Sequence, residues 1–358
     1  EVDDIDELFE VNEFSESNYA YIIDSQDYNI PAVTYDLLNN EVFTSASFKP
    51  FTIQTSTGTK SFNYGSLIIP LSVQKKLNSD ELYEKMKSIQ KKYEVNIYSV
   101  ESGLSSSGVD LGSGYVMPLN KPSAMMLIGT GVRSYEAGEV WHLLDQRVGM
   151  PITKVPMRNF DNISMDKYNV LVLVSGNYKF SDNQIEKIKT WAENGNTIIS
   201  IGSGSKLLID KKIVDENLLE KEESNAMNYL AYGDARENRG KEQIGGVILN
   251  SIIDLSHPLA FGYENNTLPL YKNNSIWLKP SNNNYSSVVR YSENSLIDGF
   301  LSENNKEKIK ESVSLVVSRV GRGIAIIFAD NPNFRGAWYG TNRLFLNAIL
   351  LGDKIRIP

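Results

Sequence analysis

Short apolar segments alternate with amphipathic segments of helical spacing along much of this 358-residue chain. Apolar runs such as Ala124–Gly129 and Asn169–Ser175 are followed by segments with apolar residues every three or four positions, such as Tyr135–Val148 and Asp182–Asn194. The latter segment opens with a capping box at Ser181. Strands that alternate with helices form parallel sheets covered on both faces, so the pattern predicts an α/β fold.

The same order of strands and helices occurs twice, which predicts two flavodoxin-like, three-layer domains. We expect the first at 15–120 and the second at 121–358, separated by the proline-flanked turn Pro118–Ser123. Residues 1–14 are acidic and predict a short helix or a linker. In the first domain we expect parallel strands and a polar loop at Thr55–Ser61.

The pattern changes in the second domain, where asparagine-rich turns separate short apolar segments. This change predicts a β-rich insertion at about 205–300. Farther on, Val313–Val320 and Ile324–Ala329 flank Gly321-Arg322-Gly323, which predicts a hairpin. A final helix is expected at Trp338–Leu351.

Composition excludes several kinds of site. The chain has no cysteine, so no Cys–His amidase centre can form. Its only histidines, His142 and His257, do not make an ordinary catalytic zinc site, and we expect no metal ligands here. The net charge of -8 argues against nucleic-acid binding. The longest apolar runs, such as Val170–Val174, are far shorter than the ~20 residues of a membrane span.

One candidate binding site follows a predicted strand. Gly129-Thr-Gly131-Val-Arg133-Ser134 ends a strand and opens a helix, as phosphate-binding turns do. It departs from the dinucleotide fingerprint at Ser134, and the next strand does not end in an acidic residue. Either this is a tight turn, or Arg133 and Ser134 form a small anion-binding site.

A second candidate site is Gly202-Ser203-Gly204-Ser205-Lys206, at another strand-to-helix turn. Proteins of the glutamine amidotransferase superfamily carry their nucleophile at this place. Either the segment is a turn that lacks a nucleophile, or Ser203 acts as a hydrolase nucleophile with His257 as its base. The other reading of His257 is structural, because a residue before proline is extended.

The run Phe328–Asn342 is the richest in polar and aromatic residues and leaves the carboxyl end of a strand, where α/β proteins bind ligands. Its aromatic residues predict either a docking surface for a partner or a cluster that seals the core. Arg335 and Arg133 are candidates for binding a carboxylate. The candidate binding residues in this run are Asp330, Asn331, Arg335, Trp338 and Tyr339.

Several blocks together resemble the C-terminal half of bacterial zinc carboxypeptidase family proteins of the Bacteroidetes type. The blocks are Val100–Leu104, Gly108–Gly112, Ser134–Asp145, His257–Tyr263 and Ala329–Asn342. These carboxypeptidase A-like proteins carry a class I glutamine amidotransferase-like domain behind the peptidase domain.

The resemblance implies that this region is a non-catalytic accessory part of a secreted or periplasmic metallocarboxypeptidase. It would act as a scaffold, regulatory or interaction module. The peptidase domain, with its zinc, would precede Glu1 in the same polypeptide and would be the partner in cis. We expect no cofactor in this region, and self-association into a homo-oligomer is a further expectation.

Overall fold

The computed structural model describes residues 11–219 and 231–358, which form two compact units. The smaller unit contains the described residues up to Pro122, and also Leu144–Pro151 and Leu255–Glu264, which the sequence placed in the second domain. Residues 1–10 of the predicted N-terminal helix or linker lie outside the described residues, and 11–14 form no helix. The larger unit comprises Ser123–Leu143, Ile152–Asp254 and Asn265–Pro358.

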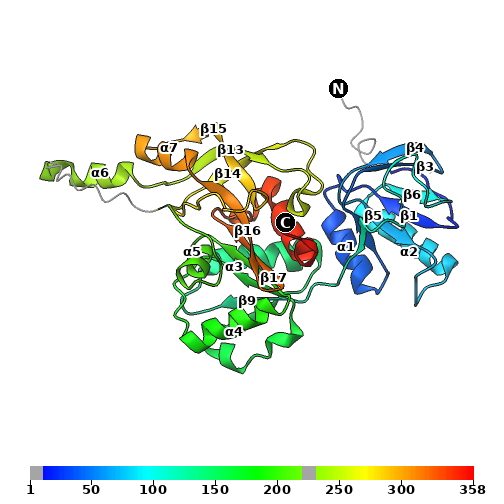
Figure 1. The fold of residues 1–358 in the computed structure, drawn as a ribbon, viewed down its shortest axis with the longest axis horizontal. Helices are drawn as coiled ribbons and strands as arrows, with labels where there is room; N and C mark the ends of the chain where they lie inside the picture. Colours follow the sequence, from blue (N-terminus) through cyan, green and yellow to red (C-terminus); the bar gives the residue numbers. More distant parts are fainter. Residues whose placement is uncertain (1–10, 220–230) are drawn as a thin grey trace. The chain divides into compact units, whose positions relative to one another are not determined.

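The larger unit is built on a nine-stranded sheet, of which five strands are parallel. Their spatial order is β10-β9-β11-β12-β17, which is the 2-1-3-4-5 order of flavodoxin-like sheets. All residues of β11, β12 and β17 are buried, as expected for strands covered on both faces. The five strands are β9 (Ala124–Ile128), β10 (Thr153–Pro156), β11 (Val170–Leu173), β12 (Thr197–Ile201) and β17 (Gly323–Phe328). Figure 1 labels β9 and β17 among them.

Four antiparallel strands extend the same sheet beyond β17. The predicted hairpin is confirmed, since β16 pairs antiparallel with β17 across Gly321, whose φ is 60°. The β-rich segments therefore widen the central sheet instead of forming a sheet of their own. The added strands are β16 (Val313–Val320), β15 (Ser287–Gly299), β13 (Val247–Ile253) and β14 (Thr267–Lys272).

The predicted capping box is confirmed: the Ser181 hydroxyl accepts a hydrogen bond from the Gln184 amide at 3.3 Å. The segment predicted as one helix at Tyr135–Val148 is α3 followed by a π-helical turn at His142–Val148. The last helix begins at Asn342, after a short 3₁₀ turn. The α-helices of this unit are α3 (Ser134–Trp141), α4 (Asp182–Glu193), α5 (Ser203–Asp210), α6 (Ala235–Lys241), α7 (Glu303–Lys310) and α8 (Asn342–Leu351).

The smaller unit is also α/β, but its main sheet is antiparallel at every pairing, so the prediction of parallel strands here is wrong. The segment predicted as a polar loop at Thr55–Ser61 belongs to a hairpin that reverses the chain before β5. Strand-helix alternation alone does not fix strand direction. The sheet order is β6-β1-β5-β2-β8, from β1 (Ala20–Ile23), β2 (Ser45–Ser47), β5 (Leu67–Pro70), β6 (Ile97–Val100) and β8 (Val116–Pro118).

A three-stranded sheet and two helices complete the smaller unit. The second sheet contains β3 (Phe51–Thr55), β4 (Gly58–Phe62) and β7 (Ser107–Gly108). The helices are α1 (Ile30–Asn39) and α2 (Ser79–Tyr93). Among the described residues, no helix has both the length and the apolar character that crossing a bilayer requires.

Asp36 joins the two helices of the smaller unit. Its carboxylate accepts hydrogen bonds from Lys85 at 2.8 Å, Lys92 at 2.7 Å and Tyr93 at 2.8 Å. Burial alone would raise the pKa of Asp36, but these three donors lower it to about 2. A depressed carboxylate pKa stabilises the fold above pH 3.8, and this stability is lost as the pH falls through 2.

We therefore expect Asp36→Asn to lower the free energy of unfolding by about 2 kcal/mol at pH 7. The difference from the wild type should shrink below about pH 4 and nearly vanish at about pH 2. Urea unfolding across this pH range measures it. Glu84→Gln, which removes an exposed partner of Lys87 on α2, is the control and should cost less than about 0.5 kcal/mol. An equal effect of both substitutions would contradict the assignment.

Candidate functional site

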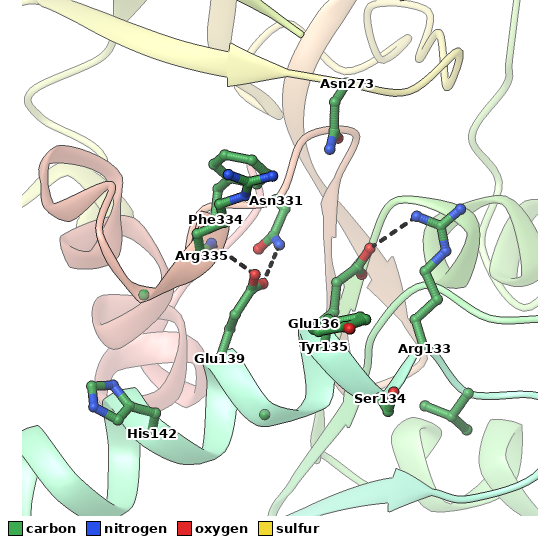
Figure 2. Close-up of a pocket in the computed structure, with 13 residues that line it drawn as sticks. Arg133, Ser134, Tyr135, Glu136, Glu139, His142, Asn273, Asn331, Phe334 and Arg335 are labelled. Carbon is green, nitrogen blue, oxygen red and sulfur yellow. Dashed lines mark hydrogen bonds and ion pairs between the residues drawn. The ribbon is translucent and has the colours of Figure 1, made fainter. Parts of the chain in front are cut away.

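The carboxyl ends of β9, β11, β12 and β17 meet at one edge of the parallel sheet, where ligands bind in open α/β folds. A pocket of about 1340 Å³ lies there in the larger unit (Figure 2). Three regions contribute side chains: the first turns of α3, the segment after β17, and Asn273 after β14. Its polar and aromatic lining is Arg133, Ser134, Tyr135, Glu136, Glu139, His142, Asn273, Asn331, Phe334 and Arg335.

Glu139 fastens the segment after β17 to α3. One carboxylate oxygen accepts a hydrogen bond from Asn331 Nδ2 at 2.6 Å, and the other accepts the backbone N–H of Arg335 at 2.7 Å. Burial raises the pKa of Glu139, and these two donors oppose the shift. Figure 2 shows the carboxylate pointing from α3 toward both partners. Glu139 thus positions the loop that carries Arg335.

Arg335 has a left-handed backbone, with φ 54° and ψ 14°, which is uncommon for a residue other than glycine. Its side chain is exposed, and its guanidinium carbon lies 5.3 Å from the centre of the Phe334 ring. The Phe334 ring stacks on Tyr271 at 3.8 Å between centroids. The aromatic pair supports the loop, and Arg335 lines the pocket beside it.

Glu136 fixes the other side of the pocket. One of its carboxylate oxygens accepts the backbone N–H of Ser175 at 2.8 Å, which ties α3 to the loop after β11. The other lies 3.7 Å from Arg133 Nη1, at the long limit of an ion pair. The Arg133 side chain is 69% exposed, whereas that of Glu136 is 13% exposed. The guanidinium of Arg133 is therefore available to a ligand.

The strand-to-helix turn after β12 has a glycine where a nucleophile would stand. Gly202 has φ 56° and ψ -119°, between the end of β12 and the first residue of α5. Hydrolases of related architecture hold their nucleophile on such a sharp, strained turn. A Cβ at Gly202 would lie 2.3 Å from Ser175 Oγ, so a neighbouring hydroxyl fills the place of a side chain.

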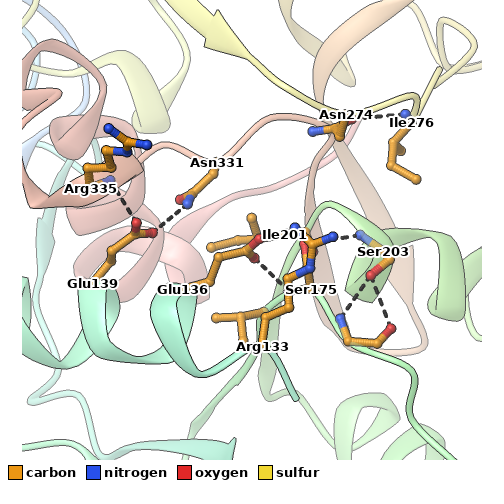
Figure 3. A network of polar contacts seen from close by, with 12 residues as sticks. Arg133, Glu136, Glu139, Ser175, Ile201, Ser203, Asn274, Ile276, Asn331 and Arg335 are labelled. Carbon is orange, nitrogen blue, oxygen red and sulfur yellow. Dashed lines mark hydrogen bonds and ion pairs between the residues drawn. The ribbon is translucent and has the colours of Figure 1, made fainter. Parts of the chain in front are cut away.

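Ser203 follows the turn, and its hydroxyl is bound to backbone. Its Oγ accepts the N–H of Gly176 at 2.8 Å and donates to the carbonyl of the same residue at 3.0 Å (Figure 3). His257 belongs to the smaller unit, where its Nδ1 accepts the N–H of Leu259 at 3.2 Å and caps a short 3₁₀ helix. Both residues thus have structural contacts in their own surroundings.

The pocket brings together four residues that the sequence singled out: Arg133, Ser134, Asn331 and Arg335. The remaining candidate binding residues, Asp330, Trp338 and Tyr339, do not line the pocket. Trp338 Nε1 donates to the Pro269 carbonyl at 3.3 Å, and Tyr339 is 50% exposed.

Asp330 is buried beneath the pocket's edge, where it accepts hydrogen bonds from three side chains. Its partners are Lys272 at 3.0 Å, Tyr291 at 2.5 Å and Ser314 at 2.7 Å. Lys272 is fully buried, and burial lowers its pKa while Asp330 opposes the shift. The network joins β14, β15 and β16 to the end of β17, so Asp330 has a structural role.

Sequence reasoning missed Glu136, Glu139 and Asn273 as pocket residues. The signal for the first two was their spacing of three on a helix directly after a strand, which places both near the ligand-binding edge. No comparable signal marks Asn273. Among residues 11–219 and 231–358, no cluster of three or more His, Cys, Asp or Glu side chains could hold a metal ion.

No protein-family model and no curated protein matches this chain. Its fold is similar to that of a ThuA-like protein from Parabacteroides merdae, with 14% identity, a TM-score of 0.43, and coverage of 66% of this chain and 92% of that one. It is also similar to a ThuA-like protein from Bacteroides uniformis, with 11% identity, a TM-score of 0.36, and coverage of 63% and 89%.

A glutamine amidotransferase from Thermotoga maritima is similar as well, with 11% identity, a TM-score of 0.35, and coverage of 59% of this chain and 76% of that one. These likenesses concern the fold alone. The predicted α/β fold class is confirmed, and the strand order of the larger unit carries its flavodoxin-like part.

Proposed function

We propose that this chain is a non-catalytic module that binds a small carboxylate at the sheet edge of an amidotransferase-like domain. The observation that carries the proposal is the turn at Gly202. The backbone of Gly202 has the strained conformation in which a hydrolase holds its nucleophile, yet glycine has no side chain. Ser175 Oγ occupies the space that a side chain at this position would need. The alternative hydrolase, with Ser203 as nucleophile, is less well supported because the Ser203 hydroxyl is bound to Gly176.

The charges of the pocket favour an anionic ligand. Both carboxylates already accept hydrogen bonds from the protein, Glu136 from Ser175 and Glu139 from Asn331 and Arg335. The side chains of Arg133 and Arg335, in contrast, are exposed at the pocket. Guanidinium groups bind carboxylates through paired, charge-assisted hydrogen bonds, so a carboxylate is the ligand that these side chains would select.

The setting that we propose is a zinc carboxypeptidase family protein, in which this module would assist a peptidase domain of the same polypeptide. The support is the resemblance of the blocks at Ser134–Asp145 and Ala329–Asn342, both of which contribute to the pocket. Zinc and peptide hydrolysis would then belong to the peptidase domain, outside the cytoplasm. Intact mass and zinc content of the protein isolated from its native source, captured with an antibody to this chain, would test that setting.

The binding proposal is tested by ligand-observed NMR with N-acetylglycine as the probe. We expect a dissociation constant on the order of 1 mM for so small a ligand. The double substitution Arg133→Gln/Arg335→Gln should weaken binding at least about tenfold, because it removes charge-assisted hydrogen bonds.

The matched control is Arg322→Gln, which removes an exposed guanidinium at the hairpin between β16 and β17. It should leave the affinity unchanged. Absence of N-acetylglycine binding, or equal binding by the double variant, would refute the proposed carboxylate site.

A further inference from the structure

We infer that the carboxylate ligand carries a large apolar group, which lies in a separate groove on the other side of α3. This inference rests on the proposed carboxylate site and specifies the class of its ligand. It comes from a second cavity of the larger unit, of about 350 Å³. Its walls include Met126, Ile128, Ala137, Trp141 and Lys154.

The groove is apolar with one cationic edge. Met126 and Ile128 come from β9, and Trp141 comes from the end of α3. Lys154 on β10 places its ammonium 4.8 Å from the centre of the Trp141 ring. A flat aromatic or branched aliphatic group would be covered by these side chains, and the positive edge again favours a ligand of negative charge.

Residues of α3 line both the groove and the polar pocket. At the helical spacing of 100° per residue, Ala137 and Trp141 face the groove, while Glu136 and Glu139 face the pocket. Val132, just before α3, and Ser134 and Gly138 of α3 line both cavities. Ser134 and Gly138 lie four residues apart on the same stripe of the helix, so the part of α3 between the cavities has one small side chain, that of Ser134, and none at Gly138.

Gly138 is the unusual residue in that part of α3. Glycine destabilises a helix interior relative to alanine, and it needs a reason to be there. Close packing is not that reason, because a Cβ at Gly138 would have no atom within 4 Å apart from those of its chain neighbours and of the backbone of α3. Because Gly138 has no side chain, nothing projects from this position into the space between the pocket and the groove. A ligand can therefore cross the helix at Gly138, with its carboxylate at the arginines and its apolar group beside Trp141.

The occupant that fits both cavities is an amphipathic monocarboxylate of the N-acylated aromatic amino acid kind. N-acetylphenylalanine, N-acetylglycine and N-acetylphenylalanine amide are the probes, compared by ligand-observed NMR titration of the whole chain. N-acetylphenylalanine should bind on the order of tenfold or more tighter than N-acetylglycine, because its ring is buried in the groove. The amide, which lacks the charge, should bind at least about tenfold more weakly than the acid.

Two substitutions test this crossing. Gly138→Leu should reduce the affinity ratio of N-acetylphenylalanine to N-acetylglycine to about one. The leucine side chain would fill the space between the pocket and the groove and keep the ring out of the groove. Gly240→Leu, at an exposed helical glycine of α6 with open surroundings, should leave the ratio unchanged. Gly138→Ala should raise the melting temperature while lowering the ratio, a combination that a glycine required by packing would not give.

The outcomes separate this inference from the proposed function. If N-acetylglycine and N-acetylphenylalanine bind equally, the groove is not used, and the carboxylate site stands without it. If the amide binds as well as the acid, or if no probe binds, both the inference and the carboxylate site are overturned. A fall in melting temperature for Gly138→Ala would also overturn the inference, since packing would then account for the glycine.

Discussion

Lys272→Met is expected to lower the free energy of unfolding by about 3–5 kcal/mol, because it leaves the carboxylate of Asp330 buried without its cationic partner. The Lys272 side chain is 0% exposed, and that of Asp330 is 5% exposed. Lys272 Nζ also donates to the Ile276 carbonyl at 2.9 Å, so the substitution removes a further hydrogen bond. Equilibrium unfolding in urea, followed by tryptophan fluorescence, measures the loss.

A double variant distinguishes the unpaired charge from simple loss of packing. Lys272→Met/Asp330→Asn removes both charges and keeps an oxygen that can accept from Tyr291 and Ser314. It should recover at least half of the stability lost in Lys272→Met, because replacing both members of a buried pair costs far less than removing one. If Lys272→Met costs under about 1 kcal/mol, the two hydroxyl donors alone suffice for Asp330, and the ion pair is not what stabilises this network.

Gly202→Ala is expected to lower the free energy of unfolding by about 3 kcal/mol or more. Two effects add: the backbone at φ 56° and ψ -119° is strained for any residue with a side chain, and the new Cβ would lie 2.3 Å from Ser175 Oγ. Thermal and urea unfolding of the variant measure the sum. A loss under about 1 kcal/mol would mean that the turn adapts easily to a side chain.

Two further variants separate strain from collision. Gly202→Ala/Ser175→Ala removes the hydroxyl and should recover the steric part, leaving about 1–3 kcal/mol of backbone strain. Gly195→Ala is the matched control for strain alone, because Gly195 has φ 109° and a Cβ there would have nothing within 4 Å. It should cost about as much as the double variant. An equal loss in all three variants would contradict a steric role for Ser175.

The parts of the fold that could be predicted are those with local signals. The capping box at Ser181 and the hairpin around Gly321 depend on residues a few positions apart, so the sequence displays them directly. The parallel strands of the larger unit followed from the alternation of short apolar segments with amphipathic segments of helical spacing. Strand direction in the smaller unit depends on the hairpin between β3 and β4, whose polar residues resemble an ordinary loop.

The candidate site was predictable to the extent that its residues follow strands. Arg133 and Arg335 were found because both lie after a strand of the parallel sheet. Glu139 was missed because a glutamate on a helix usually faces solvent, and its burial arises only when the segment after β17 packs on α3. At the glycine-serine turn, the sequence could not decide which residue occupies the strained position, and the structure assigns it to Gly202.

The claim that the turn at Gly202 carries no nucleophile is tested most directly by intact-mass analysis after treatment with a fluorophosphonate, which labels activated serines. A serine hydrolase treated in parallel serves as the positive control. We predict no adduct on the native chain, since the Ser203 hydroxyl is bound to Gly176 and no nucleophilic side chain stands at the turn itself. An adduct on Ser203 that disappears in Ser203→Ala would contradict this claim and would make this chain a serine hydrolase.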